Sequence, residues 1–274
     1  PNVVTCHDLL AVQSALGEFP EVVTGLSGRI FQRWILSGLR QAQHVVCVSE
    51  QTRSELQRLS GLPAARCSVV PNALNYPYRP MAANQAQERL QRLGAVERWP
   101  FFVHIGGNQW YKNRTGVVRL FIHLAALPQF QRHHLVLGGK PWPDDLRALV
   151  QGSELAARIH EWTELANEDL RALYSSAEAL LFPSLQEGFG WPIAEAQACG
   201  CPVVTTGRAP MTEVGGNAAV YIDPDQMPGA AVVVADALAS RQTLMAAGLR
   251  NAERFSGAAM AAGYIAAYRF VVSV

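Results

Sequence analysis

SLQEGFGWPIAEAQACGCP, residues 184–202, decides the fold, and its only charged side chains are Glu187 and Glu195. A carboxylate in so apolar a run is costly to desolvate, so we expect a hydrogen-bond donor beside Glu195. The preceding AEALLFPS, residues 177–184, is typical of a buried strand, and Pro192 suits the first position of a helix. The stretch therefore predicts a strand, a loop and the N-terminus of a helix.

This geometry gathers unpaired N–H groups and the positive end of a helix dipole at one place, where a phosphate can bind. Glu187 lies in the loop and Glu195 about one turn into the helix. Both carboxylates can therefore face one cleft and accept hydrogen bonds from a neutral polyol beside that phosphate. A sugar attached to a nucleoside diphosphate has this polarity. The alternative is structural, because the helix dipole alone favours a glutamate in the first turn and a Gly-Phe-Gly turn can serve close packing.

A second glycine-rich loop, in HIGGNQWYKNR (residues 104–114), places Gly106 and Gly107 just after an expected strand and Lys112 near the start of a helix. The spacing matches neither a dinucleotide-binding GxGxxG motif nor a Walker loop. Lys112 is one of only two lysines in the chain, and Lys140 is the other. A point charge beside a glycine-rich loop suits the neutralisation of a diphosphate leaving group. A solvated lysine at a helix start is the alternative.

Composition narrows the class of protein. A chain of 274 residues suits two modest domains, and 49% hydrophobic residues supply ample core. The net charge of +1 gives no reason to expect nucleic acid as a partner. No apolar run approaches about eighteen residues and no signal peptide opens the chain, which argues against a membrane-spanning role and leaves peripheral attachment open. The five cysteines form no Cys-x-x-Cys pair, so we expect reduced thiols in a cytosolic protein.

Strand-like and helix-like segments alternate along the chain, which predicts parallel sheets with right-handed crossovers. The first series has strands at 2–6, 44–49 and 67–70 and helices at 27–42 and 50–59. Residues 71–80, PNALNYPYRP, continue neither element and are typical of a linker. The second series has six short apolar runs, at 100–107, 133–139, 157–162, 177–183, 201–206 and 218–223. Ligands of such sheets bind beyond the carboxyl ends of the strands, where GGN and EGFG fall.

The runs FPSLQEGFGWPIAEAQACGCPVV (182–204) and MTEVGGNAAVYIDP (211–224) resemble the donor-binding half of the family 4 retaining glycosyltransferases. The resemblance extends from Val3 to the C-terminus. It implies an α/β fold of GT-B type, with two Rossmann-like doubly wound parallel-sheet domains.

The domains implied are an acceptor-side lobe at 1–71, with a helix at 256–274 packing back on it, and a donor-binding domain at 72–255. The chain opens at a strand that resembles the middle of the first domain. We therefore expect the N-terminal domain to be incomplete, as a fragment or as an unusually small lobe, and favour the fragment.

The resemblance assigns roles around the EGFG loop. Glu187 would hold the hydroxyls of the donor sugar, and Glu195 would hold the ribose of the nucleotide. Backbone groups of Gly188, Phe189 and Gly190 would lie against the sugar and the diphosphate. Glu187 as a covalent nucleophile is the less favoured proposal, because retaining enzymes of this family are thought to react on one face of the sugar.

The resemblance also gives Lys112, beside Gly106 and Gly107, the role of stabilising the leaving group. Many members carry an arginine five residues before this lysine, and here that position is Gly107. Arg114 is therefore added as a donor-binding candidate.

His7 follows an expected strand, and the matching family histidine faces the donor across the cleft. A satisfied structural histidine is the alternative. Thr163, next to Trp162, matches the region near the nucleobase, although the usual Thr-Gly becomes Thr163-Glu164 here. Residues 223–225, Asp-Pro-Asp, are expected to form a turn, and no metal site is predicted because no metal-binding cluster has ligand spacing.

The sequence thus predicts a metal-independent, retaining glycosyltransferase with no cofactor, in which His7, Lys112 and Glu187 are catalytic. It would move a sugar from a UDP- or GDP-linked donor to a hydroxyl of a glycan or lipid-linked acceptor. A sugar epimerase or phosphorylase of the same fold, and a nucleotide-sugar-binding module without a complete catalytic lobe, remain as alternatives.

The expected location is the cytoplasm, with contact at the inner face of a membrane left open. Residues 29–40 interleave arginines with Phe31, Trp34 and Ile35, which is compatible with a membrane bearing a lipid-linked acceptor. Packing of a helix on its own sheet explains the same pattern more simply.

Overall fold

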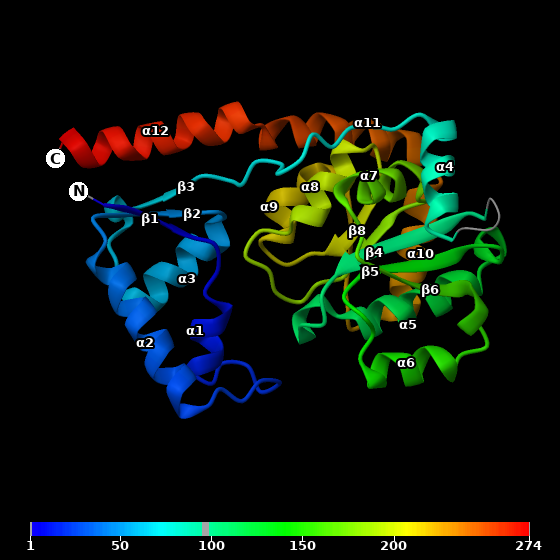
Figure 1. Cartoon of the computed structure of the whole chain (residues 1–274), viewed down its shortest axis with the longest axis horizontal. Coiled ribbons are helices and arrows are strands. Elements are labelled where there is room, and N and C mark those ends of the chain that lie inside the picture. Colours follow the sequence, from blue (N-terminus) through cyan, green and yellow to red (C-terminus); the bar gives the residue numbers. More distant parts are fainter. Residues whose placement is uncertain (1, 95–98, 274) are drawn as a thin grey trace. The chain divides into compact units, whose positions relative to one another are not determined.

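The computed structural model describes residues 2–94 and 99–273 of the chain (Figure 1). The chain forms two compact units, each containing one parallel sheet. The first unit consists of Pro1–Ala73, Glu187–Gly190 and Phe255–Val274, and the second of Leu74–Gln186 and Trp191–Arg254. The grouping of Glu187–Gly190 with the first unit was not part of the domain prediction, which placed these residues in the second domain.

A three-stranded parallel sheet with the order β1-β2-β3 organises the first unit. The strands are β1 (Val3–Cys6), β2 (His44–Cys47) and β3 (Cys67–Val69), and the elements between them are α1 (Leu10–Ala15), α2 (Leu26–Gln41), α3 (Glu50–Ser60) and the 3-10 turn η1 (Ala64–Arg66). The strands and helices expected from the first series are confirmed, and α1 was not predicted. Every residue of β2 is buried because this strand lies between two others.

Local sequence explains where α3 begins and ends. Ser49 precedes the helix, and its Oγ accepts a hydrogen bond from the backbone N–H of Thr52 at 3.1 Å. Such a cap satisfies one of the N–H groups that have no partner within the helix. Gly61 ends the helix with a φ of 72°, a left-handed conformation that glycine adopts at little cost. The N-terminus of α3 is therefore fixed, and it forms part of the site described below.

The C-terminal helix α12 (Gly257–Ser273) packs on the sheet of the first unit. Ala267 joins an apolar cluster with Val46 and Val70. The hydroxyls of Tyr264 and Thr5 are hydrogen-bonded at 2.9 Å. Residues at the two ends of the sequence thus share one core.

The face of α2 that carries aromatic residues does not pack on the sheet. Only Leu36 and Leu39 of this helix are buried, while Phe31 is 58% and Trp34 71% exposed. The simpler of the two explanations given for this pattern, packing on the helix's own sheet, is therefore wrong for these two aromatic side chains. Arg40 does have a structural role, since its guanidinium donates to the backbone carbonyls of Leu59 and Ser60 at the end of α3.

A six-stranded parallel sheet organises the second unit, with the order β6-β5-β4-β7-β8-β9. The strands are β4 (Phe101–Gly106), β5 (His134–Gly139), β6 (Ile159–Thr163), β7 (Leu180–Phe182), β8 (Val203–Thr206) and β9 (Ala219–Ile222). The helices are α4 (Ala83–Arg92), α5 (Arg114–Ala125), α6 (Asp144–Gln151), α7 (Asn167–Ser176), α8 (Trp191–Ala198), α9 (Met211–Gly215), α10 (Met227–Leu238) and α11 (Arg241–Ala252). Short 3-10 turns are η2 (Trp110–Lys112), η3 (Pro128–Phe130), η4 (Ala156–Arg158), η5 (Gly216–Ala218) and η6 (Glu253–Phe255). All six predicted strands are confirmed.

Helices cover both faces of this second sheet (Figure 1). On one face, Phe102, Leu135 and Leu181 form a buried core with side chains of α5 and α10. On the other face lie α4, α7 and α8. Because the strands are covered on both sides, their sequences are nearly continuous apolar runs, which is why they were recognisable.

The strand order places a topological switch point at β4. This strand pairs with β5 on one side and with β7 on the other, so the chain leaves β4 and β7 in opposite directions. In doubly wound sheets, ligands bind beyond the carboxyl ends of the strands at such a point. The GGN loop follows β4, and the EGFG loop follows β7.

Three smaller expectations concern cysteines, a turn and membrane spans. All five cysteines are free and buried. The Asp-Pro-Asp segment at 223–225 is a turn, in which the Asp225 N–H donates to Asp223 Oδ1 at 3.0 Å. By length and composition alone, the helical stretch Arg241–Ser273 is apolar enough to cross a membrane, a test that the core helix of a soluble protein also passes.

Candidate functional site

A cavity of about 560 Å³ lies at the carboxyl ends of β4, β5 and β6. Glycines, lysines and the first turn of α8 contribute to its wall, which includes Gly106, Gly107, Gly139, Lys112, Lys140, Thr163 and Pro192. Both lysines of the chain therefore line this one cavity. The structure brings together Gly106, Gly107, Lys112 and Thr163, which the sequence analysis had named separately.

The glycine at the end of β5 is required by geometry. Gly139 has a φ of +127°, and a Cβ there would lie 2.2 Å from the backbone oxygen of Gly106. The neighbouring strand ends thus approach each other more closely than any side chain would allow. This part of the cavity wall is bare backbone, which lets a ligand approach the main chain.

Lys112 is held by the local chain and by aromatic rings. It ends the turn η2, and the next residue, Asn113, adopts a left-handed φ of 52° and caps α5 by accepting from the Gly116 N–H at 3.2 Å. The ammonium of Lys112 lies 5.5 Å from the ring centre of Phe182 and 5.6 Å from that of Tyr111. Cation–π attraction to these rings holds the ammonium group in position.

Arg114 braces the loops that form the cavity. Its side chain is buried and donates to the Oδ1 of Asn108 and, at 2.9 Å, to the carbonyl of Lys140. Asn108 in turn donates to the carbonyl of Pro141 at 2.7 Å. Burial lowers the pKa of Arg114. The structure places the residue behind the loops after β4 and β5 and not among the residues that line the cavity.

His104 is a residue of this region that the sequence analysis did not consider. It is fully buried in β4, and its Nδ1 donates to the Leu181 carbonyl at 2.8 Å. Its Nε2 has no hydrogen-bond partner among the described residues and lies 2.9 Å from the position that a Cβ on Gly106 would take. Burial lowers the pKa of His104 to about 3, so the ring stays neutral. A histidine within the apolar run FFVHIGG was the available signal.

Glu195 has the hydrogen-bond donor that the sequence required. It lies within α8 and is buried, and its Oε2 accepts from the Tyr174 hydroxyl of α7 at 3.0 Å. Burial raises the pKa of this carboxyl group to about 7, and the bond from Tyr174 opposes the shift. The carboxyl group is thus divided between its neutral and charged forms near neutral pH.

The raised pKa of Glu195 predicts how stability depends on pH. The folded state holds this proton more tightly than the unfolded state, whose pKa is near 4.5, so stability falls as pH rises from about 4.5 to about 7. The shift corresponds to about 3 kcal/mol of unfolding free energy. Urea denaturation between pH 5 and pH 8 (about 0.5 pH unit steps) measures it. Glu195→Gln should remove this part of the slope; equal slopes in both proteins would contradict the assignment.

The EGFG loop is anchored within the first unit. The backbone oxygen of Gly188 accepts hydrogen bonds from the hydroxyls of Ser49, at 2.8 Å, and Thr52, at 3.2 Å, at the start of α3. A Cβ at Gly188 would lie 2.1 Å from the backbone oxygen of His7. The structure thus brings together Gly188 and His7, two candidates from distant parts of the sequence.

The rest of the loop presents mainly backbone. The Phe189 side chain is buried against Phe255, with ring centres 5.6 Å apart. Gly190 has a φ of +99°, which favours glycine. Glu187, at the start of the loop, is half-buried. The Phe189 ring therefore serves packing within the first unit.

Neighbouring residues at the end of β6 point to different places. Thr163 and Glu164 line the cavity, whereas Trp162 lines another one on the face of α4 and α7. Successive side chains of a strand alternate between faces, which separates the two candidates for the nucleobase region. Glu164 has a φ of 55°, at the position where the usual residue would be glycine. Among the described residues, no group of three or more His, Cys, Asp or Glu could hold a metal ion.

Comparisons with known proteins agree with this geometry. The family model described as "Glycosyl transferases group 1" matches residues 85–254, and that described as "Glycosyltransferase Family 4" matches residues 1–76. The O-antigen chain mannosyltransferase B of Escherichia coli is 30% identical over 260 residues, which cover 93% of this chain and 66% of the relative. The chain spans 32% to 66% of the length of the first three curated relatives that it matches.

Solved structures share the fold. Sucrose-phosphate synthase from Thermosynechococcus elongatus superposes with a TM-score of 0.77 at 22% identity, covering 99% of this chain and 68% of the other. HepE of Anabaena in complex with UDP-glucose superposes with a TM-score of 0.76 at 16% identity, covering 100% and 72%. Together with the two parallel sheets, these likenesses confirm an α/β fold of GT-B type.

Proposed function

Because the chain belongs to the group 1 glycosyl transferases, we propose that it transfers a sugar from a nucleoside diphosphate donor to a hydroxyl of a glycan or lipid-linked acceptor. One observation carries the proposal. The chain has only two lysines, and both line a glycine-walled cavity at the carboxyl ends of parallel strands. Two positive charges beside exposed backbone suit a diphosphate.

The cavity wall supplies further attraction for an anion. Pro192 lies in the first turn of α8, so the positive end of this helix faces the same space. In the proposed reaction Lys112 stabilises the charge that develops on the diphosphate as the bond to the sugar breaks. The diphosphate is the leaving group, and a lysine charge in place of a metal ion makes the reaction metal-independent. No cofactor is required.

The remaining roles follow the family resemblance. Glu187 orients the hydroxyls of the donor sugar, Glu195 accepts from the ribose, and Thr163 lies near the nucleobase. His7 and the EGFG backbone contact the transferred sugar. With retention of configuration, the acceptor oxygen bonds to the anomeric carbon on the face from which the phosphate oxygen leaves, and the acceptor proton passes to that phosphate.

The relatives suggest which donors to test first. The Escherichia coli relative is a mannosyltransferase for O-antigen chains, so we propose a hexose donor and a polysaccharide product. A panel of UDP- and GDP-linked hexoses, assayed by thermal shift, identifies the nucleotide, because a ligand that binds only the folded state raises its melting temperature. Transfer to an acceptor then separates a transferase from a protein that only binds the donor.

Replacing Glu187 by glutamine tests the assignment of the sugar-binding carboxylate. We expect transfer to fall by about a hundredfold or more, because a charged contact that is positioned for the transition state is lost. Steady-state transfer with the donor found in the panel is the measurement. Glu154→Gln, at an exposed position away from both loops, is the control. Normal turnover of Glu187→Gln would show that Glu187 does not hold the sugar.

Peripheral contact with the inner face of a membrane, by a cytoplasmic enzyme, is part of the same proposal. Its support is the exposed pair Phe31 and Trp34 on α2, with Arg29 and Arg33 on the same helix. Aromatic side chains and arginines together favour a surface of anionic lipid. Co-sedimentation with anionic vesicles should fall when both aromatic residues are replaced by serine, and should stay low with neutral vesicles; equal binding of the variant would contradict this contact.

A further inference from the structure

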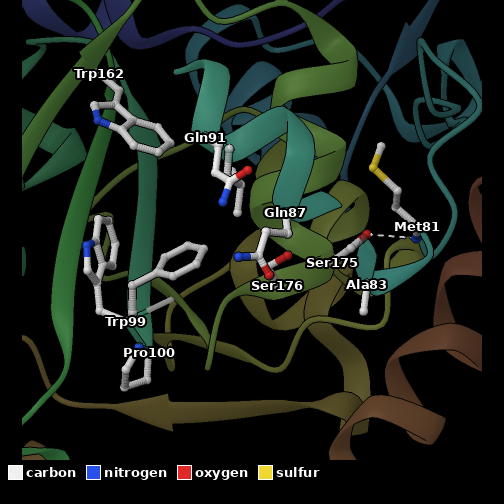
Figure 2. A pocket seen from close by; sticks show the side chains of 11 residues that line it. Met81, Ala83, Gln87, Gln91, Trp99, Pro100, Trp162, Ser175 and Ser176 are labelled. Carbon is white, nitrogen blue, oxygen red and sulfur yellow. Dashed lines mark hydrogen bonds between the residues drawn. The ribbon is translucent and has the colours of Figure 1, made fainter. Parts of the chain in front are cut away.

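A second cavity, of about 470 Å³, lies in the second unit on the face of the sheet that α4 and α7 cover. Figure 2 shows its lining, which includes Trp99, Phe101, Trp162, Gln87, Gln91 and Ser176. It shares no lining residue with the lysine cavity. Its volume falls within the range of small-molecule sites, which is about 300–1,000 Å³.

None of the described residues that line this cavity carries a charged side chain. A phosphate or nucleotide would therefore lose its hydration without gaining a counter-charge, which costs several kcal/mol or more. The first cavity differs in this respect, because two lysines line it. An uncharged ligand is required.

One wall is aromatic and rigid. The indole of Trp99 stacks on His134, with ring centres 4.4 Å apart and planes 16° apart, and on His160, at 4.8 Å and 9°. The two imidazoles are hydrogen-bonded to each other at 2.8 Å, so the rings on which the indole stacks are held in place. Trp162 lies on the same side of the cavity in Figure 2. Flat indole surfaces attract the C–H faces of a ring and lose little entropy on binding.

The opposite wall combines polar and apolar side chains (Figure 2). Gln87 and Gln91 are four residues apart on α4 and therefore share one face of the helix. Among the described residues, neither amide has a hydrogen-bond partner, and the same holds for the hydroxyl of Ser176. The Ser175 hydroxyl, by contrast, accepts from the Met81 N–H at 3.0 Å. Each amide offers donors and an acceptor to a ligand.

We propose that this cavity binds a neutral sugar ring of a glycan. Such a ring presents C–H faces to the two indoles and hydroxyls around its rim to the two amides and the serine. An acyl chain would leave these polar groups desolvated without partners, which opposes its binding. This inference rests on the proposed function in one respect: the glycan that supplies the ring is one that the enzyme extends or releases.

The test uses the full chain labelled with 5-fluorotryptophan and titrated with mannotriose, with nucleoside diphosphate absent and then saturating. We expect the fluorine signals of Trp99 and Trp162 to shift with millimolar affinity, unchanged by the nucleotide. Signals are assigned from the variants Trp99→Phe and Trp162→Phe. Replacing both Gln87 and Gln91 by alanine should weaken binding by about tenfold or more, whereas Gln85→Ala, also on α4 but outside the lining, should not.

No shift of either signal at about 10 mM mannotriose would overturn the inference. Tighter binding of 1-octanol than of mannotriose would also overturn it, as would equal affinity in the double variant. These failures are separate from failure of the proposed function. If the protein binds and uses a nucleotide sugar but no mannotriose reaches these tryptophans, only the second site is wrong; if mannotriose binds here and no nucleoside diphosphate binds at all, only the proposed function is wrong.

Discussion

Replacing Lys112 by glutamine is expected to lower kcat/KM for transfer by a factor of about 10² to 10³, which is the usual effect of removing one positioned donor from a developing negative charge. The reason is the environment of this ammonium. It lies within 5.6 Å of two aromatic ring centres and beside glycine backbone, so its position in the cavity is defined. Steady-state kinetics with a saturating acceptor measure the effect.

The division of the effect between kcat and KM distinguishes this role from simple binding. A group that acts mainly on the leaving diphosphate lowers kcat more than it raises KM. Arg119→Gln removes an exposed positive charge from the adjoining helix α5 and is the matched control, with activity expected near that of the unmodified protein. Equal losses in the two variants, or full activity in Lys112→Gln, would contradict the role given to Lys112.

Replacing Gly139 by alanine is expected to destabilise the second unit by about 3 kcal/mol or more and to abolish nucleotide binding. The backbone φ of +127° disfavours any side chain, and the new Cβ would lie 2.2 Å from the backbone oxygen of Gly106. Because the clash is with backbone, a rotamer change cannot relieve it, and the ends of β4 and β5 must separate. Urea denaturation and nucleotide calorimetry measure the two effects.

Gly229→Ala provides the control for Gly139→Ala. Gly229 lies in α10, and a Cβ there would meet nothing within 4 Å. Alanine is the better helix former, so this variant should be unchanged or more stable by up to about 1 kcal/mol. A Gly139→Ala protein with unaltered stability and nucleotide affinity would show that the close approach of the two strand ends does not shape the cavity.

The strands of both sheets could be predicted because a strand that is buried on two faces has a nearly continuous apolar sequence. The run HHLVLGG, for example, is apolar at each central position, and within β5 (His134–Gly139) the residues from Leu135 to Gly138 are all buried. The presence of a hydrogen-bond donor beside Glu195 could also be predicted, because a buried carboxyl group needs one. That the donor is Tyr174 was not foreseeable, since it comes from another helix.

What the sequence could not show depends on packing across elements. The approach of Gly139 to Gly106 follows from the register between β5 and β4, and the bracing role of Arg114 from contacts with two loops. The exposure of Trp34 depends on how α2 rotates on its sheet, which its arginines and aromatic residues leave ambiguous. Trp162 and Thr163 are adjacent in β6, and their side chains point to opposite faces because strand side chains alternate. The family resemblance considers only their place in the sequence, and it therefore grouped both residues at one site.

The central claim, that the lysine cavity receives the diphosphate of the donor, is tested most directly by amine labelling with mass spectrometry. Because Lys112 and Lys140 are the chain's only lysines, acetylation of lysine side chains reports on this cavity alone. Acetylation rates are measured relative to a lysine peptide added to the same tube. A saturating nucleoside diphosphate should slow acetylation of both residues, whereas the corresponding nucleoside without phosphate should not. Unchanged acetylation of both lysines while the nucleoside diphosphate raises the melting temperature would contradict the claim, because the nucleotide would then be bound elsewhere.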